Sequence, residues 1–177
     1  MLNTFVRIAV AVLAACALSG CIFSDYDIAQ QMQAELPIAA GKYSVMFNGK
    51  PASLTVTIAN GTYRGEGFNA AAPSPKISYL RFFRVPEFDN YIVQAWNDPE
   101  GGQKVSYTYM YASATQNGFT LAQCCDYAAL PQFLQKLVTS ERSGVRVING
   151  PRDTLYVLRE IGRRNLKLST PITYTRQ

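Results

Sequence analysis

The sequence contains no histidine. Histidine is the side chain that most often moves protons near neutral pH, and it is the commonest metal ligand among the side chains. Its absence excludes nucleophile systems of the usual Ser–His–Asp and Cys–His types, together with most zinc sites. We therefore predict no catalytic residue, no metal ligand and no cofactor.

Cysteine is also scarce, with four residues in a chain of 177. Two of them, Cys124 and Cys125, are neighbours, whereas an exported domain stapled by disulfides uses spaced cysteines. A disulfide between neighbours would be strained, because Cα atoms about 3.8 Å apart lie below the usual limit of about 4.4 Å. Two interpretations stay open: a reducible redox pair, or one thiol in the core and one on the opposite face.

Paired carboxylates could still hydrolyse glycosides without histidine. The candidates fall at predicted strand ends or turns, where acidic residues are common for solvation alone: Glu66, Glu87, Asp89, Asp98 and Glu100. The turn that begins at Asp98 lacks the ligand spacing of a twelve-residue calcium loop. A carboxylate hydrolase is therefore the least favoured of the functional hypotheses.

No apolar run reaches the roughly 20 residues that a transmembrane helix needs. The first apolar run, residues 8–18, follows the single positive charge of Arg7 and ends in the small residues Ser19 and Gly20. A basic start, a short apolar stretch and a small-residue exit are typical of a secretory signal peptide. We assign residues 1–20 to this signal.

The exit site of the signal, Leu18-Ser19-Gly20-Cys21, resembles the lipobox of bacterial lipoproteins. The resemblance covers only the first 21 residues, and the mature domain resembles no family. It implies that Cys21 is lipidated, that cleavage occurs just before it, and that its new amino group is acylated as well. Two or three acyl chains hold firmly, because each buried methylene contributes about 0.8 kcal/mol. By the same resemblance, Ile22 in place of an aspartate favours the outer membrane.

The mature chain divides into two parts by composition. Residues 21–40 are polar and alanine-rich and predict a lipidated, flexible tether, and residues 41–177 predict a single globular, β-rich domain. Residues 142–177 carry eight basic and two acidic side chains. This basic part could meet anionic lipid headgroups or simply form a solvated face. We expect no nucleic-acid partner, because no recognition motif is present.

Alternating apolar and polar residues predict a series of strands from residue 42 to residue 123. Asn48-Gly49, Asn60-Gly61 and Asn117-Gly118 are hairpin signals, because a type I′ turn needs positive φ at both central residues. Successive strands joined by tight turns indicate an antiparallel meander.

The apolar period becomes helical after these strands. Residues 130–138 predict one short helix and Pro151 begins a second, while residues 145–148 and 172–175 predict short strands. The predicted fold is α+β: a curved sheet or partly closed β-barrel of about seven or eight strands, with two short helices in the C-terminal third.

An aromatic row marks one predicted strand, where Tyr107, Tyr109 and Tyr111 share a face and Trp96 is near in sequence. The row predicts either a pocket for an amphiphile or sugar, or one wall of a barrel core. The main functional hypothesis is a non-enzymatic, lipid-anchored protein of the cell envelope that binds an envelope protein, glycan or lipid. The alternative is a carrier or sensor of a small amphiphile, with these tyrosines pointing into the barrel.

Overall fold

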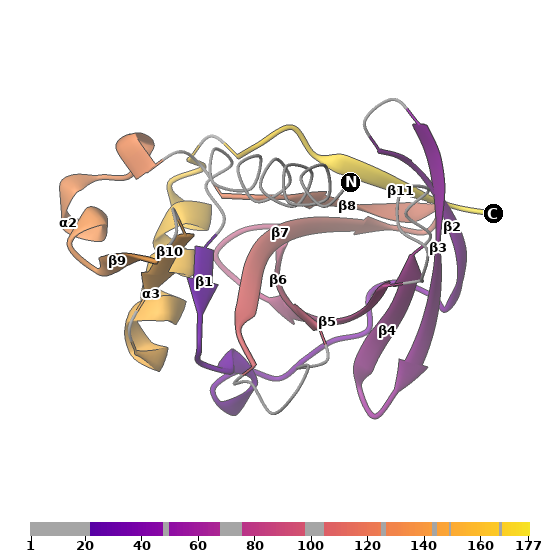
Figure 1. Cartoon of the computed structure of the whole chain (residues 1–177), viewed down its shortest axis with the longest axis horizontal. Coiled ribbons are helices and arrows are strands. Elements are labelled where there is room, and N and C mark those ends of the chain that lie inside the picture. The colour runs from indigo at the N-terminus through magenta and orange to yellow at the C-terminus, as the bar shows by residue number, and fades with distance from the viewer. Residues whose placement is uncertain are drawn as a thin grey trace, which may run out of the picture.

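The protein forms a closed antiparallel barrel with a smaller layer packed against one side (Figure 1). A computed structural model describes residues 22–47, 50–67, 76–97, 105–124, 127–142, 145–148, 150–166 and 168–177. Within these ranges, eleven strands belong to one sheet, and eight of them close on themselves where β6 (Tyr91–Asn97) pairs with β7 (Tyr107–Thr115). The predicted α+β barrel is confirmed.

The barrel is mostly a meander, as its turn residues predicted. Around the ring, the strands follow the order β6, β5, β4, β3, β2, β11, β8 and β7. Asn60 and Gly61 both have positive φ (50° and 71°) and join Ala59 to Thr62 in a two-residue turn. The bounds of the remaining barrel strands are β2 (Gly41–Phe47), β3 (Lys50–Ala59), β4 (Thr62–Gly67), β5 (Lys76–Arg84), β8 (Gly118–Ala122) and β11 (Ile172–Arg176).

Gly118 has a different role from the one its sequence context predicted. Thr115 pairs with Gly118, so the central turn residues are Gln116 and Asn117, and Gly118 is already the first residue of β8. Its φ is 154°, and a side chain there would collide with the carbonyl oxygen of Tyr174 on β11. Glycine is therefore required where β8 approaches the C-terminal strand. Asn48-Gly49 lies outside the described residues, although Phe47 and Lys50 pair on either side of it.

Aromatic rings fill the inside of the barrel. Phe82 lies at the centre, with its ring edge-on to Tyr63 at 5.3 Å and to Phe119 at 6.2 Å between ring centroids. Tyr174 stacks on Phe119 at 4.6 Å. Ile38 lies outside the strands and also packs in this core. The Tyr63 hydroxyl accepts a hydrogen bond from the Ile38 amide and donates one to the Ile38 carbonyl. The barrel interior is thus a packed core.

A second layer, the lobe, covers the outer face of the barrel wall around β7 and appears on the left of Figure 1. Its sheet is an extension in the order β7, β1, β10, β9, and a helix packs on it. The elements of the lobe are β1 (Ile22–Ser24), η1 (Ile28–Gln30), η3 (Tyr127–Ala129), α2 (Gln132–Gln135), β9 (Val138–Arg142), β10 (Val145–Ile148) and α3 (Pro151–Arg163).

One predicted helix is confirmed, and the other is much shorter than predicted. Helix α3 begins at Pro151, as predicted, and is followed by Asn165 with a φ of 48°. The helix predicted over residues 130–138 is only four residues long, because Val138 leaves the helix to pair with Ile148 in the sheet. Tertiary strand pairing overrides the helical period there.

The predicted flexible tether differs most from the structure. Residues 22–40 contain β1 and η1, and three isoleucines in this segment are buried: Ile22, Ile28 and Ile38. Glu35 also forms a bridge to Phe82 on β5. The alanine-rich composition gave no sign of this, because the three buried side chains are spaced too far apart to make a helical or strand period.

Candidate functional site

Cys21 itself lies outside the described residues, but the chain is fixed in the sheet directly after it. Ile22 pairs with Tyr109 on β7 in the antiparallel sense and with Arg146 on β10 in the parallel sense. Its side chain is 4% exposed. Strand β1 therefore joins the barrel wall to the lobe at the first residue that follows the predicted anchor.

A buried hydroxyl contact holds β1 against α3. The Ser24 hydroxyl donates to the carbonyl of Ile148 at 3.1 Å and lies 3.0 Å from the Thr154 hydroxyl, which donates to the carbonyl of Gly150 at 2.8 Å. Both side chains are fully buried. We call Ser24 and Thr154 the hydroxyl latch. Buried polar groups cost stability unless they are paired, so the two hydroxyls specify this junction.

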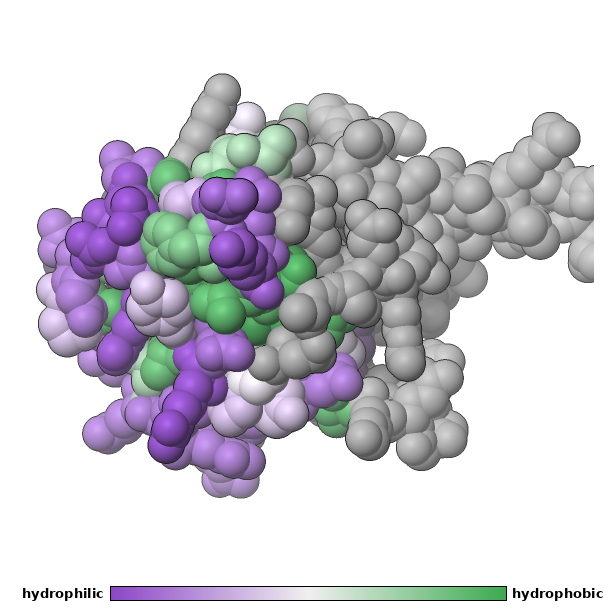
Figure 2. All heavy atoms as spheres, turned by 90° about the vertical axis from the view of Figure 1, so that its left-hand side faces the viewer, coloured by the Kyte–Doolittle hydropathy of each residue, from purple (hydrophilic) through white to green (hydrophobic). Residues whose placement is uncertain are grey.

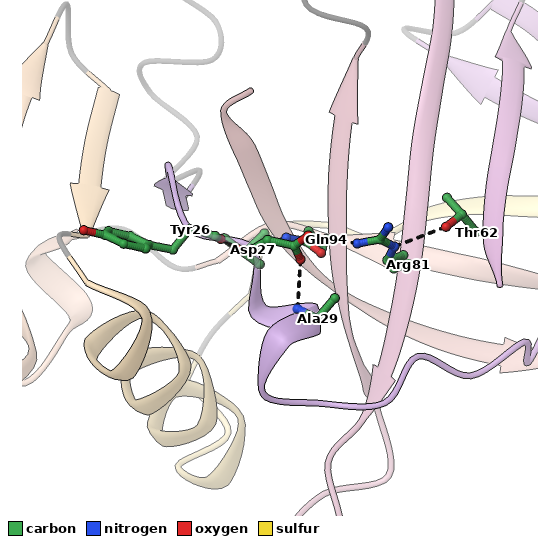
Figure 3. Close-up of polar contacts among 7 residues, drawn as sticks. Tyr26, Asp27, Ala29, Thr62, Arg81 and Gln94 are labelled. Atoms are coloured by element: carbon green, nitrogen blue, oxygen red, sulfur yellow. Dashed lines mark hydrogen bonds and ion pairs between the residues drawn. The ribbon is translucent and has the colours of Figure 1, made fainter. Parts of the chain in front are cut away.

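Asp27 links the same N-terminal segment to the barrel wall. One carboxylate oxygen accepts from the backbone amide of Ala29 and caps η1 at 2.9 Å, while the other lies 3.0 Å from Arg81 on β5. Arg81 also donates from Nε to the Thr62 hydroxyl at 3.1 Å. Figure 3 shows Arg81 reaching between Asp27 and Thr62, with Tyr26 pointing away from them.

Four partly exposed side chains on the outer face of the barrel lie in contact beside Asp27. Tyr79 and Trp96 stack at 5.4 Å between ring centroids, Tyr107 is edge-on to Trp96 at 5.8 Å, and the Arg81 guanidinium lies 4.8 Å from the Trp96 ring. They come from three neighbouring strands, β5, β6 and β7. Tyr79 on β5 pairs directly with Trp96 on β6, and β6 pairs with β7. We call Tyr79, Arg81, Trp96 and Tyr107 the outer-wall cluster.

A buried pair lies next to the outer-wall cluster. The Gln94 amide donates to the Tyr109 hydroxyl at 3.2 Å, and that hydroxyl donates to the carbonyl of Tyr26 in a short hydrogen bond. Gln94 is fully buried, and its amide oxygen has no hydrogen-bond partner in the part of the chain that is described. Burial raises the pKa of Tyr109, and burial together with the negative charge of Asp27 raises the pKa of Tyr107.

The predicted tyrosine row is present, but it faces away from the barrel interior. Tyr109 and Tyr111 belong to the core between the barrel and the lobe, and the Tyr111 hydroxyl donates to the carbonyl of Leu158 on α3 at 2.7 Å. Trp96 and Tyr107 remain partly exposed beside them. The row is therefore a wall of the lobe core, and only its first tyrosine joins the cluster around Trp96.

The other predicted site residues lie apart from the outer-wall cluster. Cys124 is buried in the lobe core at 3% exposure, and Cys125 lies outside the described residues, so the redox pair stays a prediction. Among the carboxylates, Glu66 forms a surface ion pair with Arg64 at 2.9 Å. Glu87 and Asp89 are exposed between β5 and β6, and Asp98 and Glu100 lie outside the described residues.

Sequence reasoning missed Asp27, Tyr79 and Arg81. Tyr79 and Arg81 were hidden because both faces of their strand are apolar, so the alternation did not show which face is outside. Predicting which face Tyr79 and Arg81 occupy would have required the cross-strand register, in which Arg81 pairs with Gln94. Asp27 gave no signal, because its segment had no predicted structure.

No family model, curated protein or solved structure matches the chain. Within the described ranges, no helix combines the length and apolar character needed to cross a bilayer. The same ranges hold no group of three or more cysteine, aspartate or glutamate side chains placed to bind a metal ion. What the chain does must therefore be argued from the outer-wall cluster and from the residues around β1.

Proposed function

We propose that the protein is a lipid-anchored, non-enzymatic protein of the cell envelope that binds an envelope partner protein through the outer-wall cluster. The observation that carries the anchoring is the motif Leu18-Ser19-Gly20-Cys21. Strand β1 begins immediately after this motif, which is compatible with a chain whose mature form starts at Cys21. Ile22 after the cysteine favours the outer membrane as the location.

The composition of the outer-wall cluster supports binding to a protein. Tyrosine, tryptophan and arginine are the residues most enriched at energetically important positions of protein interfaces. Trp96, Tyr107 and Arg81 are held in place by ring contacts and by the ion pair to Asp27, so little side-chain freedom would be lost on binding. A fixed aromatic and cationic surface of this kind suits a partner with apolar and acidic groups.

The carrier hypothesis needs tyrosines that point into a barrel cavity. Tyr109 and Tyr111 point out of the barrel instead, and Phe82 and Phe119 occupy its interior. The geometry therefore favours the interaction module over the carrier.

Mass spectrometry of the natively purified protein tests the anchor. We expect the signal to be absent and Cys21 to carry two or three acyl chains. Replacing Cys21 with alanine should move the protein out of the membrane fraction. An unmodified Cys21, or membrane fractionation that survives the substitution, would refute the proposal.

Photocrosslinking in intact cells tests the binding surface. A photoreactive amino acid at position 96 should give one dominant adduct, identified by mass spectrometry as an envelope protein. The matched control places the same amino acid at Ile58, an exposed position on β3, which is four strands from β7 in either direction around the barrel. Equal adducts at both positions would argue against the outer-wall cluster.

A further inference from the structure

The lobe has almost no freedom to move away from the bilayer if Cys21 is acylated, and the inference below rests on that proposed acylation. Ile22 is the first residue of β1 and is buried between β7 and β10. Consecutive Cα atoms are about 3.8 Å apart, so the lipid would be attached within one residue of the sheet. The end of the lobe where β1 begins would therefore lie at the membrane surface.

The register of β1 shows which way this anchored end points. Ser24 pairs with Tyr107 and Ile22 pairs with Tyr109, because β1 and β7 are antiparallel. Moving from Ser24 back to Ile22 is thus the same direction as moving from Tyr107 toward Tyr111. The anchored end of the lobe lies beyond Tyr109 on this line.

Helix α3 follows the same line, so its C-terminal end lies at the anchored end. In its first turn, Thr154 contacts Ser24 at 3.0 Å, and one turn later the carbonyl of Leu158 accepts from Tyr111 at 2.7 Å. At its last turn, Gly162 packs so closely on Phe88 that a side chain would overlap the ring. The Phe88 ring in turn lies 6.2 Å from that of Tyr111.

Exposed basic and aromatic side chains meet at the C-terminal end of α3. Arg163 and Arg164 are 53% and 40% exposed, and the guanidinium of Arg164 lies 5.0 Å from the ring of Phe133 on α2. Phe133 is itself 39% exposed. In Figure 2, which shows the lobe side of the molecule, apolar areas are exposed between hydrophilic residues.

Phenylalanine is found on the apolar face of helices that lie in the membrane–water boundary, and arginine buries its apolar stem there while its charged head stays in water. Charge alone would not place this surface on a membrane. Glu160 pairs with both Arg163 and Arg164, and Glu87 and Asp89 flank Phe88 in the neighbouring loop. The exposed ring beside a guanidinium is the feature that suits a headgroup region.

We propose that Phe133 and Arg164 contact the headgroup region of the bilayer that holds the Cys21 lipid. The ring would enter the boundary between headgroups and acyl chains, and the guanidinium would meet a lipid phosphate. The lobe would then face the membrane, and β3, which lies opposite β7 in the barrel ring, would face away from it.

Quenching of fluorescence by brominated lipids tests this orientation. Trp96 is the single tryptophan, so a Trp96→Phe background allows one indole to be introduced at a chosen place. The test variant is Phe133→Trp and the matched control is Ile58→Trp, since both positions are 39% exposed. The natively acylated proteins are placed in phosphatidylcholine vesicles whose lipids are brominated near the headgroup end of the acyl chains.

We expect at least twofold stronger quenching of the indole at position 133 than of the indole at position 58. Adding Arg164→Gln to the first variant should lower that quenching. Equal quenching at the two positions would overturn the proposed orientation. Failure of the anchor itself is distinguishable, because a protein without acyl chains on Cys21 would have the unmodified mass and would not enter the vesicles.

Discussion

The barrel and the lobe are built from very different parts of the chain. In the barrel, strands that follow one another in sequence pair with one another from β2 through β8, and only β11 arrives from far away. In the lobe, β1 meets β7 and β10, and the two members of the hydroxyl latch are 130 residues apart. Contacts between distant segments cost more loop-closure entropy, so we expect the lobe to open before the barrel.

The two regions also differ in how they are held. The barrel core contains a connected set of aromatic rings around Phe82. The core between the barrel and the lobe is mostly aliphatic, and the pairing of β1 with β7 joins the two regions. Buried hydroxyls add to this: the hydroxyl latch joins β1 to α3 within the lobe, and the Tyr111 hydroxyl joins β7 of the barrel to α3. Substitutions in one region at a time test whether the barrel and the lobe are stabilised differently.

The largest effect is expected from the centre of the barrel. Phe82→Ala removes a fully buried ring that touches Tyr63, Tyr91 and Phe119. We expect it to lower the free energy of unfolding by about 3–5 kcal/mol, measured by urea denaturation. Phe133→Ala is the control, and at an exposed site it should cost far less. Similar losses from both variants would show that the aromatic core does not dominate stability.

A smaller loss is expected where β8 approaches the C-terminal strand β11. In Gly118→Ala the new methyl group collides with backbone of β11, and the positive φ is strained as well. We expect a loss of more than about 2 kcal/mol, since a left-handed conformation alone costs an alanine about 1–2 kcal/mol. Gly61→Ala is the control, because its φ is also positive, at 71°, and nothing lies within 4 Å of its new side chain. If the two substitutions cost the same in urea denaturation, the close approach of β11 contributes nothing.

The hydroxyl latch should give an effect confined to the lobe. Ser24→Ala leaves the carbonyl of Ile148 and the hydroxyl of Thr154 without this partner in a buried place. We expect a cost of about 1–3 kcal/mol, seen as faster hydrogen exchange in β1 and α3 but not in β3 and β4. Ser44→Ala, at a partly exposed hydroxyl on β2 with a 3.3 Å bond to Thr175, is the matched control. Uniform acceleration across the barrel strands would contradict the separation of the two regions.

The same division explains what could be predicted from the sequence. Alternation and Asn60-Gly61 act over a few residues, and they predicted the antiparallel meander, as a curved sheet or partly closed barrel, correctly. The lobe depends on pairing between distant segments, so β1 could not be seen in the composition of residues 22–40. The candidate surface shows the same limit: Trp96 and Tyr107 were recognised as an aromatic group, but Arg81 and Asp27 needed the register and the path of the N-terminal segment.

The smallest effect is expected from pH, and it belongs to the lobe. Hydrogen bonds from Arg163 and Arg164 lower the pKa of Glu160 to about 2. A carboxyl whose folded pKa lies below its unfolded value, about 4.3, adds stability above that unfolded value, and this stability is lost as pH falls toward 2. The pair is on the surface, so salt should weaken the effect.

Thermal unfolding between pH 5 and pH 2 measures this contribution. Glu160→Gln removes the titrating group, so the melting temperature of the variant should fall less steeply with acid than that of the wild type, and the difference should shrink in high salt. Glu66→Gln is the control, because Glu66 pairs with the single arginine Arg64 on the barrel wall. If both variants flatten the acid slope equally, the acid sensitivity does not belong to the C-terminal end of α3. A selective change would mean that acid releases Arg163 and Arg164 from Glu160 and adds positive charge beside Phe133, where the lobe is proposed to meet lipid phosphates.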